Sequence, residues 1–356
     1  MKCDADTAAW IQLSLVPQLG PALFRDLLKA FGLPRDILRT SPSKLGRVVP
    51  QPVAVSIGND TRRAEVDRAL AWLEEPGRVL LTLADGAYPR QLLEIADPPA
   101  LLYVQGDASL LARPSLAIVG SRNASPQGRA NAEDFARALS CAGLTIVSGL
   151  ALGIDAAAHR GALPGEGRTI AVLGTGADIL YPRANAALAN EIAARGAIVS
   201  EFPLGAPPLA VHFPRRNRVI SALSRGCLVV EAALASGSLI TARLAAEQGR
   251  DVFALPGSIH SPLSRGCHAL IKQGAKLVES AADVLAELGF PGAPSVPKVL
   301  SPDQGLIQYM GYEPCDTDSL VRRSGLTAEA VSAMLLQLEL EGRVGSLPGG
   351  LYQRIG

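Results

Sequence analysis

Seven short apolar runs between residues 116 and 278 constrain the fold of this chain more than any other feature. They are apolar throughout and do not alternate with polar residues, which is typical of strands covered on both faces. Helical patterns lie between several of them, over 127–141, 184–195, 238–248 and 280–288. This alternation predicts an α/β fold with a Rossmann-like, doubly wound, mostly parallel sheet. The predicted strands are Leu116 to Val119, Leu144 to Val147, Thr169 to Leu173, Ala197 to Val199, Leu228 to Val230, Val252 to Leu255 and Lys276 to Val278.

The regions on either side of this pattern have a different character. The N-terminal part contains short amphipathic helices, one of which begins at Gly20-Pro21 and ends at Gly32. Toward the C-terminus, a segment rich in Pro, Gly and Ser precedes three helical patterns and a hairpin around Pro348-Gly349-Gly350, which is the layout of a winged helix. We therefore expect a small all-α module (1–75), the α/β domain (76–290), a linker (291–304) and a winged helix (305–356).

Charge and cysteine usage narrow the class of protein. The net charge of the 356 residues is only +1, so a site for a polyanion must be a local patch. The five cysteines are scattered without a Cys-x-x-Cys pair, which argues against a zinc site or a disulfide framework and fits a reducing cytosol. The start does not resemble a signal peptide, and no apolar stretch approaches the ~20 residues that span a bilayer. We expect a cytoplasmic protein with no membrane partner, no metal and no cofactor.

Small-residue turns follow three of the predicted strands, at the strand ends where open α/β sheets bind ligands. Such turns let backbone N–H groups approach an anion, and an arginine in the first can contact a phosphate. Alternatively they are simply tight turns between strand and helix. The third, a Gly-x-Gly, has Ile179 where a dinucleotide site needs a glycine, so a NAD or FAD site is disfavoured. The candidate residues are Gly120, Ser121 and Arg122, then Ser148, Gly149 and Gly153, then Gly174 and Gly176.

An arginine cluster is the most informative polar segment. Three arginines fall within four residues, directly after an aromatic residue, in an otherwise near-neutral chain. Guanidinium groups bind phosphates and an aromatic ring can stack on a base, although a solvated helix start is the alternative. The candidates are Phe213, Arg215, Arg216, Asn217 and Arg218.

A Ser-Gly-Ser turn follows the strand that ends near Glu231. Hydroxyl and free N–H groups at the start of its helix can bind an anion, or serve only as a helix cap. Because the ends of parallel strands meet at one edge of a sheet, all these elements should line a single groove suited to a polyanion. The candidates here are Ser236, Gly237, Ser238 and Thr241, with Lys272 on a later helix.

Seven of these motifs, in this order and spacing, resemble the DNA-processing protein A family, also called Smf. The motifs are GSRNAS (120–125), SGLALGIDAAAH (148–159), LGTGADILYP (173–182), SEFPLG (200–205), HFPRRNRVISALS (212–224), VVEAALASGSLITA (229–242) and ALPGS (254–258).

This resemblance implies an extended Rossmann fold that binds single-stranded DNA without catalysing a reaction. It implies homodimerisation through that domain, protection of incoming single strands in natural transformation, and help in loading the recombinase RecA, with a single-strand-binding protein as another partner. By motif position Arg122 and the segment 215–218 are the implied DNA contacts.

The flanking modules resemble appendages of the same family. The N-terminal one is similar to a helix-hairpin-helix or sterile-alpha-motif-like module, with Gln18 where such hairpins carry a second glycine. The winged helix (298–356) holds five basic and seven acidic residues, a net charge of −2, which favours a protein contact or a structural role over duplex DNA.

Two other functions stay open. The stretch 231–241 is similar to the glycine-rich turn of the lysine-decarboxylase-like phosphoribohydrolases, with Glu231 or Glu247 as the candidate acid, although no catalytic set can be placed. A transcription regulator that uses the winged helix is the third reading. We interpret the lone His159 as a structural histidine.

Overall fold

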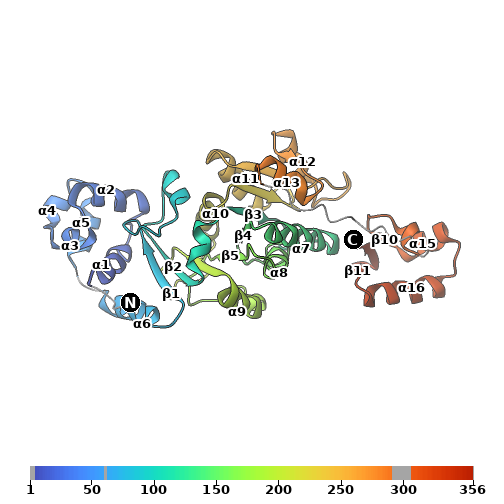
Figure 1. Cartoon of the computed structure of the whole chain (residues 1–356), viewed down its shortest axis with the longest axis horizontal. Coiled ribbons are helices and arrows are strands. Elements are labelled where there is room, and N and C mark those ends of the chain that lie inside the picture. Colours follow the sequence, from blue (N-terminus) through green and yellow to red (C-terminus); the bar gives the residue numbers. More distant parts are fainter. Residues whose placement is uncertain (1–4, 60–61, 291–305, 356) are drawn as a thin grey trace.

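A nine-stranded sheet forms the centre of the computed structural model, which describes residues 5–59, 62–290 and 306–355. The strand order is β1-β2-β6-β5-β4-β3-β7-β8-β9, and β2 alone runs antiparallel to its neighbours (Figure 1). All seven predicted strands are present, which confirms the doubly wound α/β fold. The strands are β1 (Arg78–Thr82), β2 (Leu101–Gly106), β3 (Ser115–Val119), β4 (Thr145–Ser148), β5 (Thr169–Val172), β6 (Ala197–Ser200), β7 (Gly226–Val229), β8 (Asp251–Ala254) and β9 (Lys276–Leu277).

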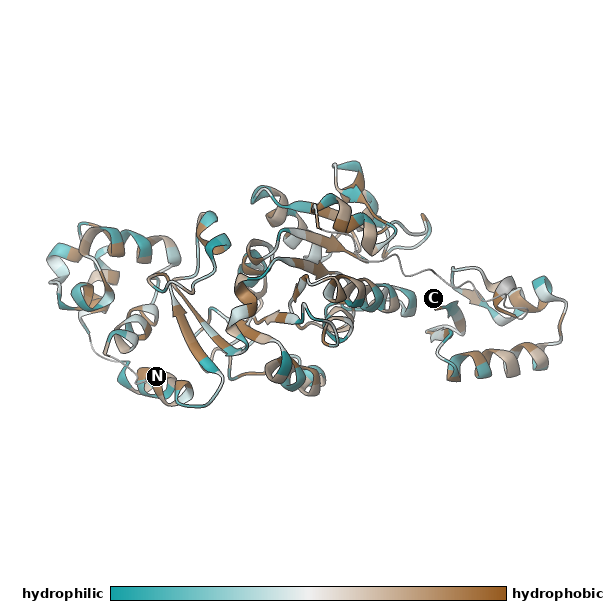
Figure 2. Ribbon diagram, viewed as in Figure 1, coloured by the Kyte–Doolittle hydropathy of each residue, from teal (hydrophilic) through white to brown (hydrophobic). Residues whose placement is uncertain are grey.

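Helices cover both faces of this sheet, so the strands are buried on both sides (Figure 2). In β3, Leu116 and Ile118 join one core while Ala117 and Val119 join the other. This explains why the strands are apolar throughout. One face carries α7 (Pro126–Cys141), α8 (Ile154–Ala162), α9 (Ala186–Arg195) and α13 (Ala281–Glu287), and the other carries α10 (His212–Leu223), α11 (Gly237–Glu247) and α12 (Arg265–Lys272).

The order of strands creates a topological switch point between β3 and β7. The chain moves outward from β3 through β4 and β5 to β6, and then returns to place β7, β8 and β9 on the other side of β3. The loops that leave β3 and β7 therefore diverge and open a crevice at the carboxyl ends of these strands, where doubly wound sheets bind ligands.

The N-terminal helices pack directly on the antiparallel end of the sheet. Ile11, Val66 and Trp72 share one core with Leu80 and Tyr103 of strands β1 and β2. The Trp72 and Tyr103 rings meet edge to face, with centroids 5.9 Å apart. The helices are α1 (Ala5–Ser14), α2 (Pro21–Phe31), α3 (Pro34–Arg39), α4 (Pro42–Leu45), α5 (Gln51–Gly58) and α6 (Arg63–Leu73).

The hairpin between α1 and α2 uses a glycine-like backbone without a glycine. Gln18 has a φ of +63°, in the left-handed region that favours glycine. The Gln18 side chain is exposed, so the packing of the fold would also accommodate a glycine at this position.

The C-terminal module has the layout of a winged helix, with α14 (Ile307–Met310), α15 (Thr317–Ser324), α16 (Ala328–Leu340) and a three-stranded sheet in the order β10-β12-β11. Its core is its own and includes Met310, Leu320 and Leu335. The module lies beside α7, where Gly345 comes close to the Pro126 ring (Figure 1). The predicted linker 291–304 lies outside the described residues, and the domain boundaries stay a prediction. The strands are β10 (Cys315–Asp316), β11 (Val344–Leu347) and β12 (Leu351–Arg354).

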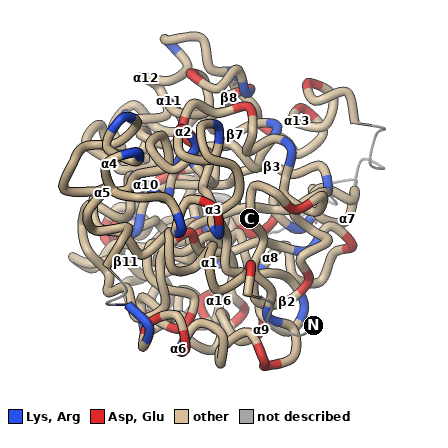
Figure 3. The backbone as a smooth tube through the Cα atoms, turned by 90° about the vertical axis from the view of Figure 1, so that its left-hand side faces the viewer, with Lys and Arg blue, Asp and Glu red and all other residues tan. Residues whose placement is uncertain are grey.

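Charge is mixed over the molecule, as the sequence indicated. Lysines and arginines are interspersed with aspartates and glutamates in the view of Figure 3. Within the described ranges no helix is long and apolar enough to cross a membrane, and no three His, Cys, Asp or Glu residues gather as a metal site. Cys141, Cys227, Cys267 and Cys315 are free thiols.

Candidate nucleic-acid interface

A groove of about 750 Å³ lies at the switch point. Its walls come from the loop after β3, the first turns of α10 and α11, the loop after β7, and Tyr181. Ten of the eighteen predicted site residues line it, although they come from segments as far apart in the sequence as Gly120 and Thr241. They are Gly120, Ser121, Arg122, Phe213, Arg216, Asn217, Ser236, Gly237, Ser238 and Thr241.

Arg122 is the exposed cation of this groove. Its guanidinium carbon lies 5.5 Å from the centroid of the Phe213 ring, which is the range of a cation–π contact. Among the residues that the structure describes, no hydrogen bond or ion pair engages the guanidinium, so its N–H donors are available to a ligand. Arg122 can therefore bind a phosphate without first breaking a contact with a carboxylate.

The start of α11 forms the facing wall. The Ser236 hydroxyl accepts a hydrogen bond from the Ser238 amide at 3.3 Å and lies 2.7 Å from the Ser238 hydroxyl. The positive end of an 11-residue helix thus opens into the groove together with two hydroxyl groups. N-capping and anion binding are compatible at this position.

Arg216 is buried at the base of the groove, where it hydrogen-bonds backbone carbonyl groups. One of its terminal nitrogens, Nη1, donates to the carbonyl oxygen of Gly149, at 2.7 Å, and to that of Val172. Beside it Asp155 accepts from the amides of Gly149 at 3.1 Å and Ala151 at 3.4 Å. Burial raises the pKa of Asp155, and the nearby Arg216 opposes that shift. This arginine thus joins the ends of β4 and β5 to α10.

Arg218 and Arg215 are both engaged by Glu201. The Arg218 side chain is only 6% exposed and forms ion pairs with Glu201 and, at 3.0 Å, with Asp97. Arg215 is half-exposed, pairs with Glu201 at 3.4 Å and lies over the Phe202 ring. Burial raises the pKa of Glu201, and the two arginines oppose that shift.

The arginine cluster does not form one exposed patch in the structure, because Arg216 and Arg218 are buried while Arg215 is exposed. Arg216 and Arg218 are partners of internal carbonyl and carboxylate groups, and replacing these partners by a phosphate would leave buried oxygens or charges unpaired. Asn217 remains at the groove, where its amide lies 3.5 Å from the Gly237 carbonyl oxygen.

The remaining predicted residues support the groove or lie outside its lining. The Ser148 hydroxyl is buried and donates to the Ile118 carbonyl at 2.6 Å, and the Gly176 amide donates to the Ala206 carbonyl at 3.0 Å. Gly149 and Gly153 pack against Arg216 and the 121–122 backbone. Lys272 is exposed on α12, away from the groove lining.

Phe213 is half-buried and is backed by Gly174. A Cβ atom at Gly174 would lie 2.9 Å from the Phe213 ring, so the ring packs directly on this glycine. Arg122 and Arg216 approach the same ring, and Tyr181 lies 5.8 Å away at a 45° tilt. The ring thus packs against several groove residues and is less exposed than Tyr181.

The N-terminus of α7, which would be the phosphate position of a nucleotide site, already holds an anion. The Glu231 carboxylate accepts hydrogen bonds from the Ser125 amide at 2.9 Å and the Ser125 hydroxyl at 2.6 Å. A Cβ atom at Gly128 would lie 2.3 Å from the carboxyl carbon, so glycine is required for this approach. A nucleotide phosphate would have to displace this carboxylate.

His159 has a structural environment. Its ring nitrogens contact the Leu150 amide at 3.3 Å and the Thr169 hydroxyl at 2.7 Å. Burial lowers the pKa of His159 to about 3, so the ring is neutral at physiological pH.

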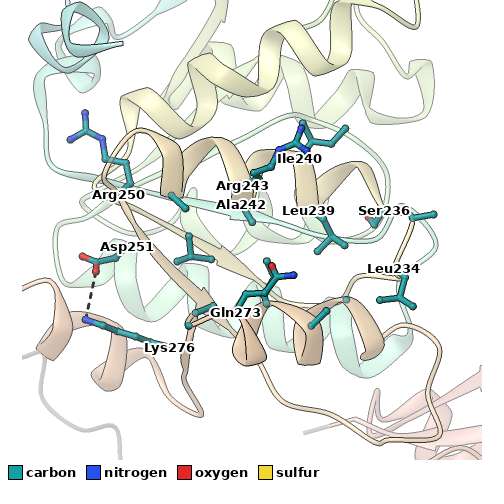
Figure 4. Close-up of a pocket in the computed structure, with 18 residues that line it drawn as sticks. Leu234, Ser236, Leu239, Ile240, Ala242, Arg243, Arg250, Asp251, Gln273 and Lys276 are labelled. Atoms are coloured by element: carbon teal, nitrogen blue, oxygen red, sulfur yellow. Dashed lines mark ion pairs between the residues drawn. The ribbon is translucent and has the colours of Figure 1, made fainter. Parts of the chain in front are cut away.

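A second hollow, of about 770 Å³, lies between α11 and α12 (Figure 4). Its lining is largely apolar, with Leu239 and Leu270 from the two helices, and an ion pair between Asp251 and Lys276 spans 3.6 Å at its edge. Ser236 is the sole predicted site residue in its lining.

Tyr181 is one of several groove-lining residues that were not predicted from the sequence; Asn123 and Asp155 are others. Tyr181 lies within the motif LGTGADILYP (173–182), in which only Gly174 and Gly176 were predicted as site residues. Its side chain lines the groove and is 42% exposed. An aromatic residue in the loop that follows a central strand was the available signal.

The fold and its groove define a class: an α/β protein with a doubly wound sheet, an open switch-point crevice and an appended winged helix. Residues 79–289 match the model of the family described as DNA recombination-mediator protein A, and residues 291–350 match the DprA winged helix domain. The chain therefore belongs to the DNA recombination-mediator protein A family, also called DprA or Smf.

Curated relatives and solved structures support the same family assignment. The chain is 47% identical to protein Smf of Escherichia coli over 82% of each chain, and 52% identical to DNA processing protein DprA of Streptococcus pneumoniae over 59% of this chain and 74% of that one. The crystal structure of the S. pneumoniae protein covers 80% of this chain and 99% of its own, with 40% identity and a TM-score of 0.71. A structure of the Helicobacter pylori protein, described for its single-stranded DNA binding mode, covers 59% of this chain and 95% of its own at 34% identity and a TM-score of 0.54.

Proposed function

We propose that this chain binds single-stranded DNA in the switch-point groove and acts by positioning the strand, without catalysis. The observation that carries the proposal is that one groove contains the exposed Arg122, which forms no ion pair with a described carboxylate, the N-terminus of α11 and an aromatic pair. Phosphates would be held by the arginine and the N–H and hydroxyl groups around Ser236, and unstacked bases would meet the aromatic side. The relative from H. pylori, described as binding single-stranded DNA, supports the same assignment.

The nucleotide-hydrolase alternative has less support from the geometry. Both Glu231 oxygens are hydrogen-bonded by Ser125. Glu247 lies at the far end of α11, where its exposed side chain is 3.7 Å from Arg243. Neither glutamate is among the residues that line the groove, where a general acid or nucleophile would have to contact the substrate.

The finer parts of the proposal depend on family membership. We propose that the protein protects incoming single strands in natural transformation, helps to load the recombinase RecA, acts as a homodimer through the α/β domain and works in the cytoplasm. A single-strand-binding protein is a further proposed partner. These roles are supported by the family resemblance, and the free thiols are compatible with a reducing compartment.

A titration with a fluorescent oligothymidine and a matched duplex, each at several salt concentrations, tests the central proposal. We expect tighter binding of the single strand, with log Kd changing by roughly 0.7 per phosphate contact for each tenfold change in salt. Equal affinity for the duplex would contradict a groove built for unstacked strands. Release of ribose 5-phosphate from a nucleoside monophosphate would instead favour the hydrolase.

A further inference from the structure

The lining of the groove includes an exposed aromatic residue, Tyr181. Tyr181 is 42% exposed, and no hydrogen bond engages its hydroxyl within the part of the chain that the structure describes. The ring contacts Phe213, with centroids 5.8 Å apart at a 45° tilt, and stays partly exposed. An exposed, supported aromatic ring beside a cationic wall is the arrangement that single-strand binders use for bases.

Phe213, which the sequence favoured for stacking, is poorly placed for it. Gly174 lies against its ring, and the guanidinium carbons of Arg122 and Arg216 lie 5.5 and 6.0 Å from its centroid. These groups cover part of the ring, and Phe213 is less exposed than Tyr181. Phe213 is therefore better suited to support Tyr181 and to orient Arg122.

Exposed apolar residues adjoin the groove lining in the sequence, which adds a second observation. Each of them is next in sequence to a residue that lines the groove. Apolar surface near the groove suits the faces of unstacked bases better than the phosphate backbone. These residues are Leu152 (44% exposed), Leu209 (48%) and Val211 (73%).

We propose that Tyr181 is the residue on which a base of the bound strand stacks, with Phe213 as its support and Arg122 on the adjacent phosphate. This inference rests on the proposed function and deepens it, because it assigns base and backbone recognition to different residues. Tyr181 supplies sequence-tolerant stacking, since every base has a π face, and Arg122 supplies the charge-dependent part of the affinity.

The test compares four proteins on two ligands of equal length: oligothymidine and an abasic oligomer with the same phosphates. Tyr181→Ala should weaken binding of oligothymidine by roughly 5- to 100-fold and leave binding of the abasic oligomer and the salt dependence unchanged. Tyr181→Phe should bind both ligands like the unaltered chain, because stacking does not use the hydroxyl. Tyr309→Ala, an exposed tyrosine on the winged helix, is the matched control and should change neither affinity.

The possible outcomes separate the two proposals. If Tyr181→Ala lowers the affinity for both ligands equally, or for neither, Tyr181 does not stack on a base. If the unaltered chain shows no preference for oligothymidine over duplex, the proposed function fails first and the stacking role fails with it. Photocrosslinking of an oligomer containing 5-iododeoxyuridine to the unaltered chain needs no variant: a crosslink at Tyr181 supports the proposal, and a crosslink confined to Phe213 overturns it.

Discussion

Replacing Arg216 by alanine should lower the free energy of unfolding by roughly 3–5 kcal/mol, the range for breaking a buried charge pair. The guanidinium of Arg216 is the donor to the Gly149 and Val172 carbonyls and the cation nearest the buried Asp155. Without it these oxygens lose a partner and Asp155 stays buried with no opposing charge. Chemical denaturation followed by circular dichroism measures the change.

The matched control is Arg215→Ala, one residue earlier on the same helix. The Arg215 side chain is 46% exposed, and its ion pair with Glu201 is partly screened, so the expected loss is within roughly 1 kcal/mol. An Arg216→Ala variant that unfolds like the unaltered chain but no longer binds oligothymidine would show that Arg216 contacts the DNA and is not a structural residue.

Arg122→Ala should have the opposite profile, with a large loss of binding and little loss of stability. A charge-assisted hydrogen bond contributes ~1.5–3 kcal/mol, so Kd for oligothymidine should rise by roughly 10- to 100-fold. The log-log salt slope should become shallower by about 0.7 if Arg122 neutralises one phosphate. The melting temperature should stay unchanged, because Arg122 is exposed and its one described contact is with the Phe213 ring.

Arg243→Ala provides the comparison for net charge. Arg243 is also an exposed arginine, 68% accessible, but it faces the other hollow and pairs with Glu247. If Arg243→Ala weakens DNA binding as much as Arg122→Ala does, the effect comes from overall charge and the groove is not the site.

The central sheet could be predicted because each of its parallel strands is an apolar segment followed by a helix or turn. Strands β1 and β2 were missed for a physical reason. They are joined without a crossover helix, and β2 pairs antiparallel with β6, a strand about 95 residues later in the chain, so the β-α-β rhythm is absent there. Only the three-dimensional fold shows that Tyr103 lies opposite Ser200.

The site could be predicted in part. The turns after β3 and β7 lie at the groove as expected, because the ends of parallel strands meet at one edge. The orientations of the clustered arginines were harder to predict, because successive residues of a helix are rotated by about 100° and cannot share one face. Arg216 consequently points inward and Arg215 outward, and the carboxylate that engages Arg218, Glu201, comes from a different element.

The shared core between the N-terminal helices and the sheet gives the chain a natural optical probe. Its two tryptophans, Trp10 and Trp72, both belong to these helices, and Trp72 packs on Tyr103 of β2 with the Arg78 guanidinium over its indole ring. The emission spectrum of Trp72 therefore depends on whether the helices are seated on the sheet. The groove has no tryptophan among its lining residues, so intrinsic fluorescence reports on this seating, while extrinsic dyes are needed to follow the DNA.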